Sequence, residues 1–319
     1  VSAHAEALSR ALPARSHAIN LAENRYHFLI GWGAACLRGQ LTLLPSSQAA
    51  SAVEDLARTY TDHHVIDDER METFLRQSIC APATELPAWR IPADTIVAIA
   101  FTSGTTGAPQ PHPKTWRSLV RNAQLAAQEA LGGAGSNIVA TVPPQHMYGL
   151  EASLIPALSA RCCVYDEKPF FPADVLTALE RIESPRTLVT TPAHLKVLIE
   201  SSTDLPPLQR IVSATAPLAT DLAARIETRW GVPVLEIYGC TEAGVMANRR
   251  TTHDQCWRTF GEASVRVSAD GAATYNAPQL PEPVPLQDII EQRSESEFFL
   301  RNRGADMIKV AGKRASLQD

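Results

Sequence analysis

A run of glycines and hydroxyl-bearing residues at 102–107 constrains this chain more than any other feature. It reads Thr-Ser-Gly-Thr-Thr-Gly and follows an apolar, β-branched run at 95–100 that is typical of a buried strand. Apolar residues at helical spacing occupy 115–130, so we expect the loop to lie between a core strand and a helix. Glycine lets a backbone turn tightly and bring its amides close to an anion. The stretch therefore predicts a phosphate-binding loop.

The loop is not a Walker A motif, because no Gly-Lys-Ser or Gly-Lys-Thr follows at the required spacing. Taken alone, it fits an ordinary polar surface turn equally well. A second stretch at 235–244, Leu-Glu-Ile-Tyr-Gly-Cys-Thr-Glu-Ala-Gly, favours phosphate binding, since it is another strand that runs into a turn. Tyr238 can stack on a base, Thr241 can donate to a phosphate and Glu242 can bind Mg²⁺. A nucleoside triphosphate requires two such turns.

Together, Thr-Ser-Gly-Thr-Thr-Gly-x-Pro at 102–109 and Tyr-Gly-x-Thr-Glu at 238–242 resemble the motifs of the adenylate-forming enzymes, which comprise acyl-CoA synthetases, luciferases and adenylation domains of peptide synthetases. The resemblance extends from near Leu21 to the end of the chain. It implies an α/β fold, the large N-terminal domain of that family, with mostly parallel sheets layered with helices and a small antiparallel region. We expect this ATP- and acyl-binding domain over 1–300. Residues 301–319 are then the hinge and the start of a mobile C-terminal domain, whose remainder and catalytic Lys are missing.

Alternating strand and helix patterns independently favour a parallel sheet. Besides the strands before the two motifs, strands are expected at 17–21, 41–45, 65–66, 136–142, 162–165 and 187–191, and a strand followed by a turn is expected at 211–218. Helices are expected at 3–12, 24–38, 49–60, 115–130, 172–183, 192–200 and 221–230. The Pro-containing segments 78–94 and 274–285 are expected to be irregular. The acidic run 67–69 and the pair His63-His64 are interpreted as solvated surface, and the adjacent Cys162 and Cys163 as core residues.

The resemblance also implies which residues bind ATP. The phosphate loop would contribute Thr102, Ser103, Gly104, Thr105, Thr106 and Gly107, and Thr241 would contact the α-phosphate. Tyr238 and Gly239 would lie against adenine, bordered by Ala214, Thr215, Ala216 and Pro217, where the family has Gly-Gly-Ala-Pro. Asp288 and Arg303 would bind ribose, and Glu242 would bind Mg²⁺. Of the family's Thr-Gly-Asp ribose motif, only the Asp is present here.

The sequence departs from the family pattern at the phosphate loop, where Gln110 stands in place of the usual Lys. Lys114 either supplies the missing charge, or is an exposed cation near a helix start while backbone amides and hydroxyls bind the phosphates alone. Near the C-terminus, Lys309 matches the Lys of the family's Gly-Arg-x-Asp-Asp-x-Ile-Lys, whereas Ala305 replaces the first Asp. Lys114, Lys309 and His146 are the candidate catalytic residues.

His146 belongs to a Pro-x-x-His-x-x-Gly segment at 143–149, which in this family forms a wall of the acyl pocket. The resemblance places His146 near the reacting carboxylate, with Tyr148, Gly149, Leu150 and Cys240 as pocket walls. Relatives that activate amino acids carry an Asp hereabouts to pair with the substrate ammonium, and this chain has Tyr148-Gly149 instead. Because an unpaired buried ammonium is costly, we argue against an α-amino acid substrate.

Composition restricts the partners. The net charge of −5 and the pI near 6.0 give no support for nucleic acid or a membrane surface as a partner. No apolar run approaches the ~20 residues of a membrane span, and the N-terminus lacks the pattern of a signal peptide. The six cysteines show no Cys-x-x-Cys spacing, which is typical of reduced thiols in the cytoplasm. The start at Val1 and the end inside a motif suggest a fragment.

The resemblance implies the reaction carboxylate + ATP → acyl-AMP + pyrophosphate, followed by transfer of the acyl group to a thiol. The Pro-Gln-Pro-His tail of the phosphate loop is similar to stand-alone ligases of bacterial aryl-polyene (xanthomonadin-type) pigment clusters, which load a hydroxybenzoate-type acid onto an acyl carrier protein. One alternative is an acyl-CoA synthetase for aryl or fatty acids. Another is a catalytically inactive nucleotide-binding module, which Gln110 favours. A kinase-like phosphotransferase fits poorly, because no kinase signature is present.

Overall fold

A computed structural model of the protein describes residues 1–78, 90–103, 109–201, 204–301, 307–310 and 313–316, with Ser103 and the last two ranges described as backbone only. The N-terminal part forms a five-stranded sheet in the order β3-β1-β2-β4-β5. Its strands are β1 (His17–Asn20), β2 (Leu41–Leu44), β3 (His63–Ile66), β4 (Ile96–Ser103) and β5 (Pro109–Thr115). The first four are parallel, and β5 runs antiparallel to β4. Its helices are α1 (Ser2–Ala11), α2 (Arg25–Leu37), α3 (Ala50–Thr59) and α4 (Asp68–Gln77).

A second sheet contains nine strands in the order β16-β17-β12-β11-β10-β9-β8-β6-β7. Its parallel half consists of β6 (Asn137–Ala140), β7 (Cys163–Val164), β8 (Arg186–Thr190), β9 (Arg210–Ser213) and β10 (Val234–Cys240). The antiparallel half adds β11 (Gly244–Arg249), β12 (Trp257–Thr259), β16 (Ile289–Gln292) and β17 (Glu297–Arg301). Two small antiparallel sheets follow, β13 (Ser264–Val267), β14 (Ala273–Asn276) and β15 (Val284–Leu286) in one, β18 (Met307–Val310) and β19 (Lys313–Ser316) in the other.

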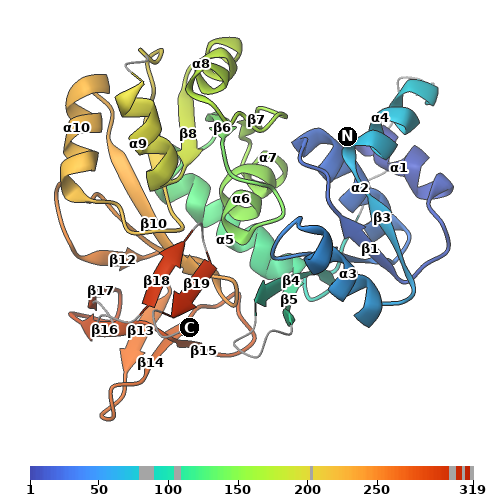
Figure 1. Cartoon of the computed structure of the whole chain (residues 1–319). Helices are drawn as coiled ribbons and strands as arrows, with labels where there is room; N and C mark the ends of the chain where they lie inside the picture. The colour runs from blue at the N-terminus through green and yellow to red at the C-terminus, as the bar shows by residue number, and fades with distance from the viewer. Residues whose placement is uncertain (79–89, 104–108, 202–203, 302–306, 311–312, 317–319) are drawn as a thin grey trace.

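Helices pack on the second sheet and between the two sheets. They are α5 (Trp116–Glu129), α6 (Met147–Gly149), the π-helix η1 (Leu150–Leu154), α7 (Ile155–Ser159), α8 (Pro172–Arg181), α9 (Pro192–Glu200) and α10 (Thr220–Trp230). Figure 1 shows α5 crossing the middle of the molecule, between the N-terminal sheet with α1–α4 and the second sheet with α8–α10. Among the described residues, no helix is both long and apolar enough to cross a bilayer.

The sequence patterns that predicted the helices have local physical causes in the structure. Asn24 caps α2 by accepting from the backbone N–H groups of Tyr26 and His27, and Thr115 caps α5 by accepting from Ser118. Gly231 ends α10 in the left-handed conformation at φ +62°, which glycine adopts without strain. All seven predicted helices and the predicted strands are confirmed, with small shifts at their ends.

The phosphate loop does not lead directly into a helix as expected, because β5 intervenes at 109–115 and pairs with β4. Prolines at 109, 111 and 113 argued against a strand, since proline cannot donate to a ladder. β5 lies at the edge of its sheet, where a strand needs hydrogen bonds on one side only, so alternating prolines are tolerated. The sequence of the predicted phosphate loop therefore lies between two strands that pair antiparallel.

Two other expectations were wrong, those for the segment 274–285 and for Cys163. Residues 147–159, for which no element was predicted, form α6, η1 and α7, with Pro156 in the first turn of α7. The acidic run 67–69 is partly exposed, in agreement with its interpretation as surface, and it begins α4, with Asp67 as the N-cap and Asp68 accepting from the backbone of Glu23 and Asn24. The proline-rich segment 274–285 includes most of β14 and the start of β15. Cys162 is buried, but Cys163 is exposed.

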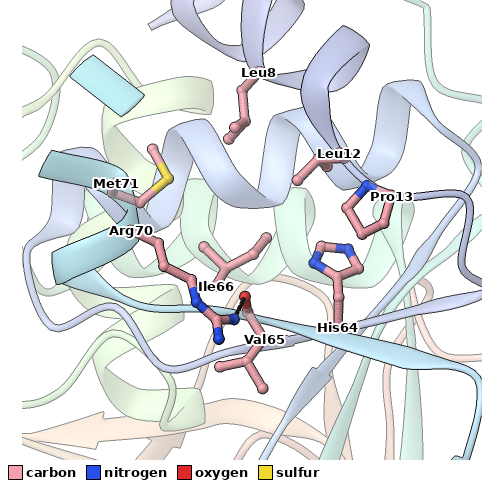
Figure 2. Close-up of a pocket in the computed structure, with 8 residues that line it drawn as sticks. All are labelled: Leu8, Leu12, Pro13, His64, Val65, Ile66, Arg70 and Met71. Carbon is pink, nitrogen blue, oxygen red and sulfur yellow. Dashed lines mark hydrogen bonds between the residues drawn. The ribbon is translucent and has the colours of Figure 1, made fainter. Parts of the chain in front are cut away.

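A cavity of about 190 Å³ lies between α1, β3 and α4 (Figure 2). It is lined by Leu8, Leu12, Pro13, His64, Val65, Ile66, Arg70 and Met71. Since β3 and β5 are opposite edges of the five-stranded sheet, this cavity is separated from the phosphate-loop hairpin by the width of that sheet. It is not part of the site described below.

Candidate active site

The candidate site lies at the carboxyl ends of the parallel strands of the second sheet, where ligands of open α/β sheets bind. Strand β6 leads to the segment that carries His146, β9 leads to 214–217, and β10 leads to 238–242. Because β9 and β10 are neighbours in the sheet, the two predicted nucleotide segments that follow them lie side by side.

The β4–β5 hairpin meets the turn between β10 and β11. Thr102 Oγ1 lies 3.0 Å from His112 Nε2, and the same nitrogen lies 3.9 Å from Glu242 Oε1. Lys114 Nζ donates to the backbone carbonyl of Glu242 at 2.7 Å. Two stretches about 140 residues apart in sequence thus converge, as the ATP hypothesis requires. Of the other predicted loop residues, Gly104, Thr105, Thr106 and Gly107 and the side chain of Ser103 lie outside the described residues.

Lys114 is only 4% exposed, so its interpretation as an exposed cation was wrong. Burial lowers the pKa of its ammonium, and the charges of Glu151 and Glu242 oppose that shift. Side chains alternate along a strand, so Gln110, His112 and Lys114 share one face of β5. Along that face the exposure falls from Gln110, which is exposed, to Lys114, which is buried beneath the β10–β11 turn. Burial also lowers the pKa of His112, against the influence of Glu242.

The residues predicted for adenine and ribose also come together. The Tyr238 hydroxyl donates to Asp288 Oδ2 at 2.8 Å. The Tyr238 ring packs against Trp257 and Phe298, with ring centroids 5.6 and 5.8 Å apart, and these contacts fix its orientation. A side chain added at Gly239 would lie 2.3 Å from the carbonyl of Gly244, so the close approach of β10 and β11 requires glycine there. Arg303 lies outside the described residues, and of Lys309 only the backbone in β18 is described.

A buried carboxylate, that of Glu236, fixes the backbone at the end of the segment 214–217. The sequence analysis did not predict this role. Glu236 accepts from the backbone N–H of Leu218 at 2.9 Å, from Thr251 Oγ1 at 2.9 Å and from Arg249 at 2.7 Å. Thr215 is exposed and has a φ of +79°, which is strained for a β-branched residue. Ala214 is buried, so the segment presents Thr215, Ala216 and Pro217 toward solvent. The position of Glu236 as a single Glu within an apolar strand is the sequence feature that could have indicated a buried, paired carboxylate.

Contacts with β9 and with the chain's own backbone hold the segment 143–150, which is predicted to bind the acid, in place. The Tyr148 hydroxyl donates to the carbonyl of Val212 in β9 at 2.9 Å, and Leu150 is buried in the core. A Cβ at Gly149 would lie 2.0 Å from the carbonyl oxygen of Pro143. His146, just before α6, is exposed and therefore accessible to a substrate. Burial raises the pKa of Cys240 to about 12, so this residue is a neutral thiol.

Arg25 is the buried residue that fixes the loop before His146. Its guanidinium is fully buried and donates to the carbonyls of Ala140, Val142 and Glu167 at 2.6–2.9 Å. Burial lowers its pKa to about 10. A buried charge is tolerated only where acceptors surround it, and here the acceptors are backbone carbonyls at the end of β6 and after β7. The sequence offers no signal that distinguishes this arginine from a surface residue of α2.

Within the described residues, His, Cys, Asp and Glu side chains nowhere gather in threes that could hold a metal ion. The carboxylate of Glu242 is 44% exposed beside Thr102 and His112, while its backbone carbonyl is occupied by Lys114. Magnesium in nucleotide enzymes is commonly held by one or two carboxylates plus substrate phosphates and water. A single accessible carboxylate at the phosphate side of the site therefore fits Mg²⁺ bound together with ATP.

His112 and Glu151 also belong to the site and were not predicted from sequence. The alternation of prolines with polar residues at 109–114 was the available signal for His112, because a period of two is typical of a strand. Glu151 is 1% exposed, and its position inside the apolar run Leu-Glu-Ala-Ser-Leu-Ile was the available signal.

Residues 9–272 match the model of the AMP-binding enzyme family. The chain is 27% identical over 266 residues to a 4-coumarate–CoA ligase of Rhodobacter capsulatus, covering 82% of this chain and 65% of that protein. It is 31% identical over 226 residues to a 4-coumarate–CoA ligase of Halorhodospira halophila, covering 67% and 53%. The chain thus spans between half and two-thirds of the length of these relatives.

Solved structures show the same fold. The chain superposes on o-succinylbenzoate CoA synthetase (MenE) from Bacillus subtilis in complex with ATP and magnesium ion with a TM-score of 0.75 at 16% identity, covering 99% of this chain and 75% of that one. It superposes on the N-terminal domain of FACL13 from Mycobacterium tuberculosis with a TM-score of 0.75 at 16% identity, covering 95% and 90%. The expected α/β fold of the N-terminal domain is therefore confirmed. Because the family model matches most of its length, this chain belongs to the AMP-binding enzyme family.

Proposed function

We propose that the protein uses ATP to activate a carboxylic acid as an acyl-AMP, with release of pyrophosphate, and then transfers the acyl group to a thiol. The observation that carries this proposal is the convergence of Thr102, His112 and Glu242 next to the Tyr238–Asp288 pair. That arrangement offers hydroxyl and carboxylate groups for a metal-bound triphosphate beside an aromatic ring and a carboxylate for a nucleoside. Membership of the AMP-binding family supports the same reaction.

In this reaction the substrate carboxylate attacks the α-phosphorus in line, and negative charge increases on the phosphoryl oxygens. Thr102 and the rest of the 102–107 loop would bind the β- and γ-phosphates, and Thr241 the α-phosphate. Tyr238 would lie against adenine while Asp288 accepts from the ribose hydroxyls. Mg²⁺ held by Glu242 would supply further neutralising charge. Residues 1–300 would form this domain, and residues 301–319, with Arg303 and Lys309, would lead to a mobile C-terminal domain.

The proposed acid is an aryl acid of the hydroxybenzoate type. Relatives named for 4-coumarate and indoleacetate, and an anthranilate CoA ligase of the same fold, support an aromatic substrate. Within 143–151 the sole carboxylate is Glu151, which is buried and accepts from Asn122 and Val245. It is therefore not available to pair with a substrate ammonium, which supports the argument against α-amino acids.

For the acceptor we propose the thiol of an acyl carrier protein in a pigment-type cluster in the cytoplasm. This proposal rests on the Pro-Gln-Pro-His sequence at 109–112. CoA is the second candidate, since the similar curated proteins are named CoA ligases. The two are separated by offering full-length protein, MgATP and acid to CoA and to a phosphopantetheinylated carrier protein in parallel and detecting the thioesters by mass spectrometry.

Acid-dependent exchange of radiolabelled pyrophosphate into ATP by the full-length protein tests the first step. We expect exchange with 4-hydroxybenzoate or 4-coumarate that exceeds exchange with octanoate and with phenylalanine, together with an acyl-AMP detectable by mass spectrometry. A protein truncated to residues 1–319 should bind ATP but exchange far more slowly. Binding of ATP without exchange for any acid would instead identify an inactive nucleotide-binding module and overturn the proposal.

A further inference from the structure

The turn between β10 and β11 is held by three buried side chains from three different elements. Lys114 of β5 donates to the carbonyl of Glu242 at 2.7 Å. Asn122 of α5 donates to the carbonyl of Ala243 at 2.9 Å, and the carboxylate of Glu151 in η1 accepts from the N–H of Val245 at 2.7 Å. The backbone of 242–245, which carries the candidate metal ligand, is thus positioned by side chains rather than by its own hairpin alone.

These side chains also contact one another. Asn122 Nδ2 donates to Glu151 Oε1 at 3.0 Å, and Gln279 Nε2 donates to Asn122 Oδ1 at 2.8 Å. The exposed fractions of Lys114, Asn122, Glu151 and Gln279 are 4%, 1%, 1% and 5%. A buried carboxylate near a buried ammonium is often no more stabilising than apolar residues of the same volume. A contribution to stability therefore does not explain why these four buried side chains are polar. This favours a role for them in the site.

Glu151 connects the two halves of the proposed reaction. It directly follows the acid-binding segment 143–150, in which α6 ends at Gly149 and η1 begins at Leu150 without an intervening loop. On its other side it touches the metal-side turn so closely that a Cβ at Gly244 would lie 2.2 Å from its Oε2. Gly244 has a φ of +80°. A movement of 143–150 would therefore displace the turn that carries Glu242 through this one close contact. In addition, π-turns such as η1 are common at functional sites.

We propose that Glu151 is a positioning residue that couples binding of the acid at 143–150 to binding of MgATP at the 242–245 turn. This inference rests on the proposed function and adds a route between the two substrate sites. Asn122 transmits the same coupling, because it holds both the Glu151 carboxylate and the Ala243 carbonyl. Coupling between two ligands is reciprocal, so each should change the affinity for the other by the same factor.

The test compares full-length wild type with Glu151→Gln at pH 8.5, where the carboxyl is ionised, so that the substitution keeps the shape of the side chain but removes its charge. The affinity for α,β-methylene-ATP with Mg²⁺ is measured by calorimetry with and without the acid that gives the fastest exchange, starting from 4-hydroxybenzoate. We expect the acid to change the affinity of wild type at least about 5-fold, a typical coupling. In Glu151→Gln this factor should fall to about 1, while each ligand alone still binds.

Glu227→Gln is the matched control. Glu227 of α10 also accepts from a backbone N–H, that of Val234 at 2.9 Å, and from Arg250 just after β11, but neither partner belongs to 143–150 or 242–245. It should retain the wild-type coupling factor. If Glu151→Gln does not fold, as judged by thermal unfolding, Asn122→Ala provides the same measurement. An unchanged coupling factor in a folded variant, or no coupling in an exchange-active wild type, overturns this inference alone, whereas a wild type without exchange overturns the proposed function with it.

Discussion

At the scale of single residues, the fold changes the protonation of the buried Glu151. Burial raises the pKa of its carboxyl to about 7, although Asn122, Val245 and Lys114 favour the ionised form. The unfolded chain ionises this group near its ordinary pKa of about 4.3, whereas the folded protein retains the proton up to about 7. Between these pH values the unfolded state binds fewer protons, so the contribution of Glu151 to stability falls as pH rises.

We therefore expect the free energy of unfolding of Glu151→Gln, relative to wild type, to increase between about pH 4.5 and 7, by up to about 3 kcal/mol. Urea denaturation of both proteins across pH 4.5–8 measures this difference, and other titrating groups cancel in the comparison. A difference that stays constant over that range would show that Glu151 is ionised in the fold at all these values.

Thr215 provides a second prediction at this scale. Its φ of +79° is unfavourable for a β-branched residue, by about 1–3 kcal/mol, and its exposed side chain gains little from packing. Thr215→Gly should therefore raise the free energy of unfolding by about 1 kcal/mol, after the greater chain entropy of glycine is subtracted. Thr61 is an exposed threonine outside the positive-φ region, so Thr61→Gly should be neutral or destabilising. Equal effects of the two substitutions in urea would argue against strain at Thr215.

At the scale of elements, α6 begins where the backbone of 143–149 folds back on itself. A Cβ at Gly149 would lie 2.0 Å from the carbonyl oxygen of Pro143, and a backbone atom cannot move aside as a side chain can. Gly149→Ala should destabilise the protein by at least about 2 kcal/mol and abolish acid-dependent exchange, despite the higher helix propensity of Ala. Gly31→Ala in α2 is the control, because its new Cβ would meet a side chain, with Ile66 Cγ2 at 2.8 Å, rather than a backbone carbonyl. It should cost clearly less in the same urea titration.

The elements also show what the sequence could and could not predict. Helices such as α2 and α5 were predictable because capping residues and apolar periodicity agree locally. β5 was not, because three prolines oppose a strand and only its place at a sheet edge makes them acceptable. Within the site, Thr102, Tyr238 and Glu242 belong to contiguous motifs and were found. Glu151 and Asn122 were not, since their roles depend on contacts across about 90–120 residues of sequence.

At the scale of the whole molecule, one buried guanidinium joins the two large sheets. Arg25 lies in α2 of the N-terminal part and donates to carbonyls at the end of β6 and at Glu167, both in the second part of the chain. Its backbone N–H also donates to the carbonyl of Asp166 at 2.6 Å. The loop that carries His146 starts at this junction, so its position depends on how the two sheets are held together.

Arg25→Met should therefore act on both stability and the site. It fills a similar volume but leaves two buried carbonyls, those of Ala140 and Val142, without their donor, each of which costs about 1–3 kcal/mol. We expect the free energy of unfolding in urea to fall by at least about 3 kcal/mol. Arg38→Met, at the exposed end of the same helix, should change it by less than about 0.5 kcal/mol.

Because the freed carbonyls border the loop before His146, the acid concentration for half-maximal exchange should also rise in Arg25→Met under conditions where the variant is folded. A variant that loses stability but binds the acid as wild type does would show that the junction holds the sheets together without setting the position of the acid-binding segment.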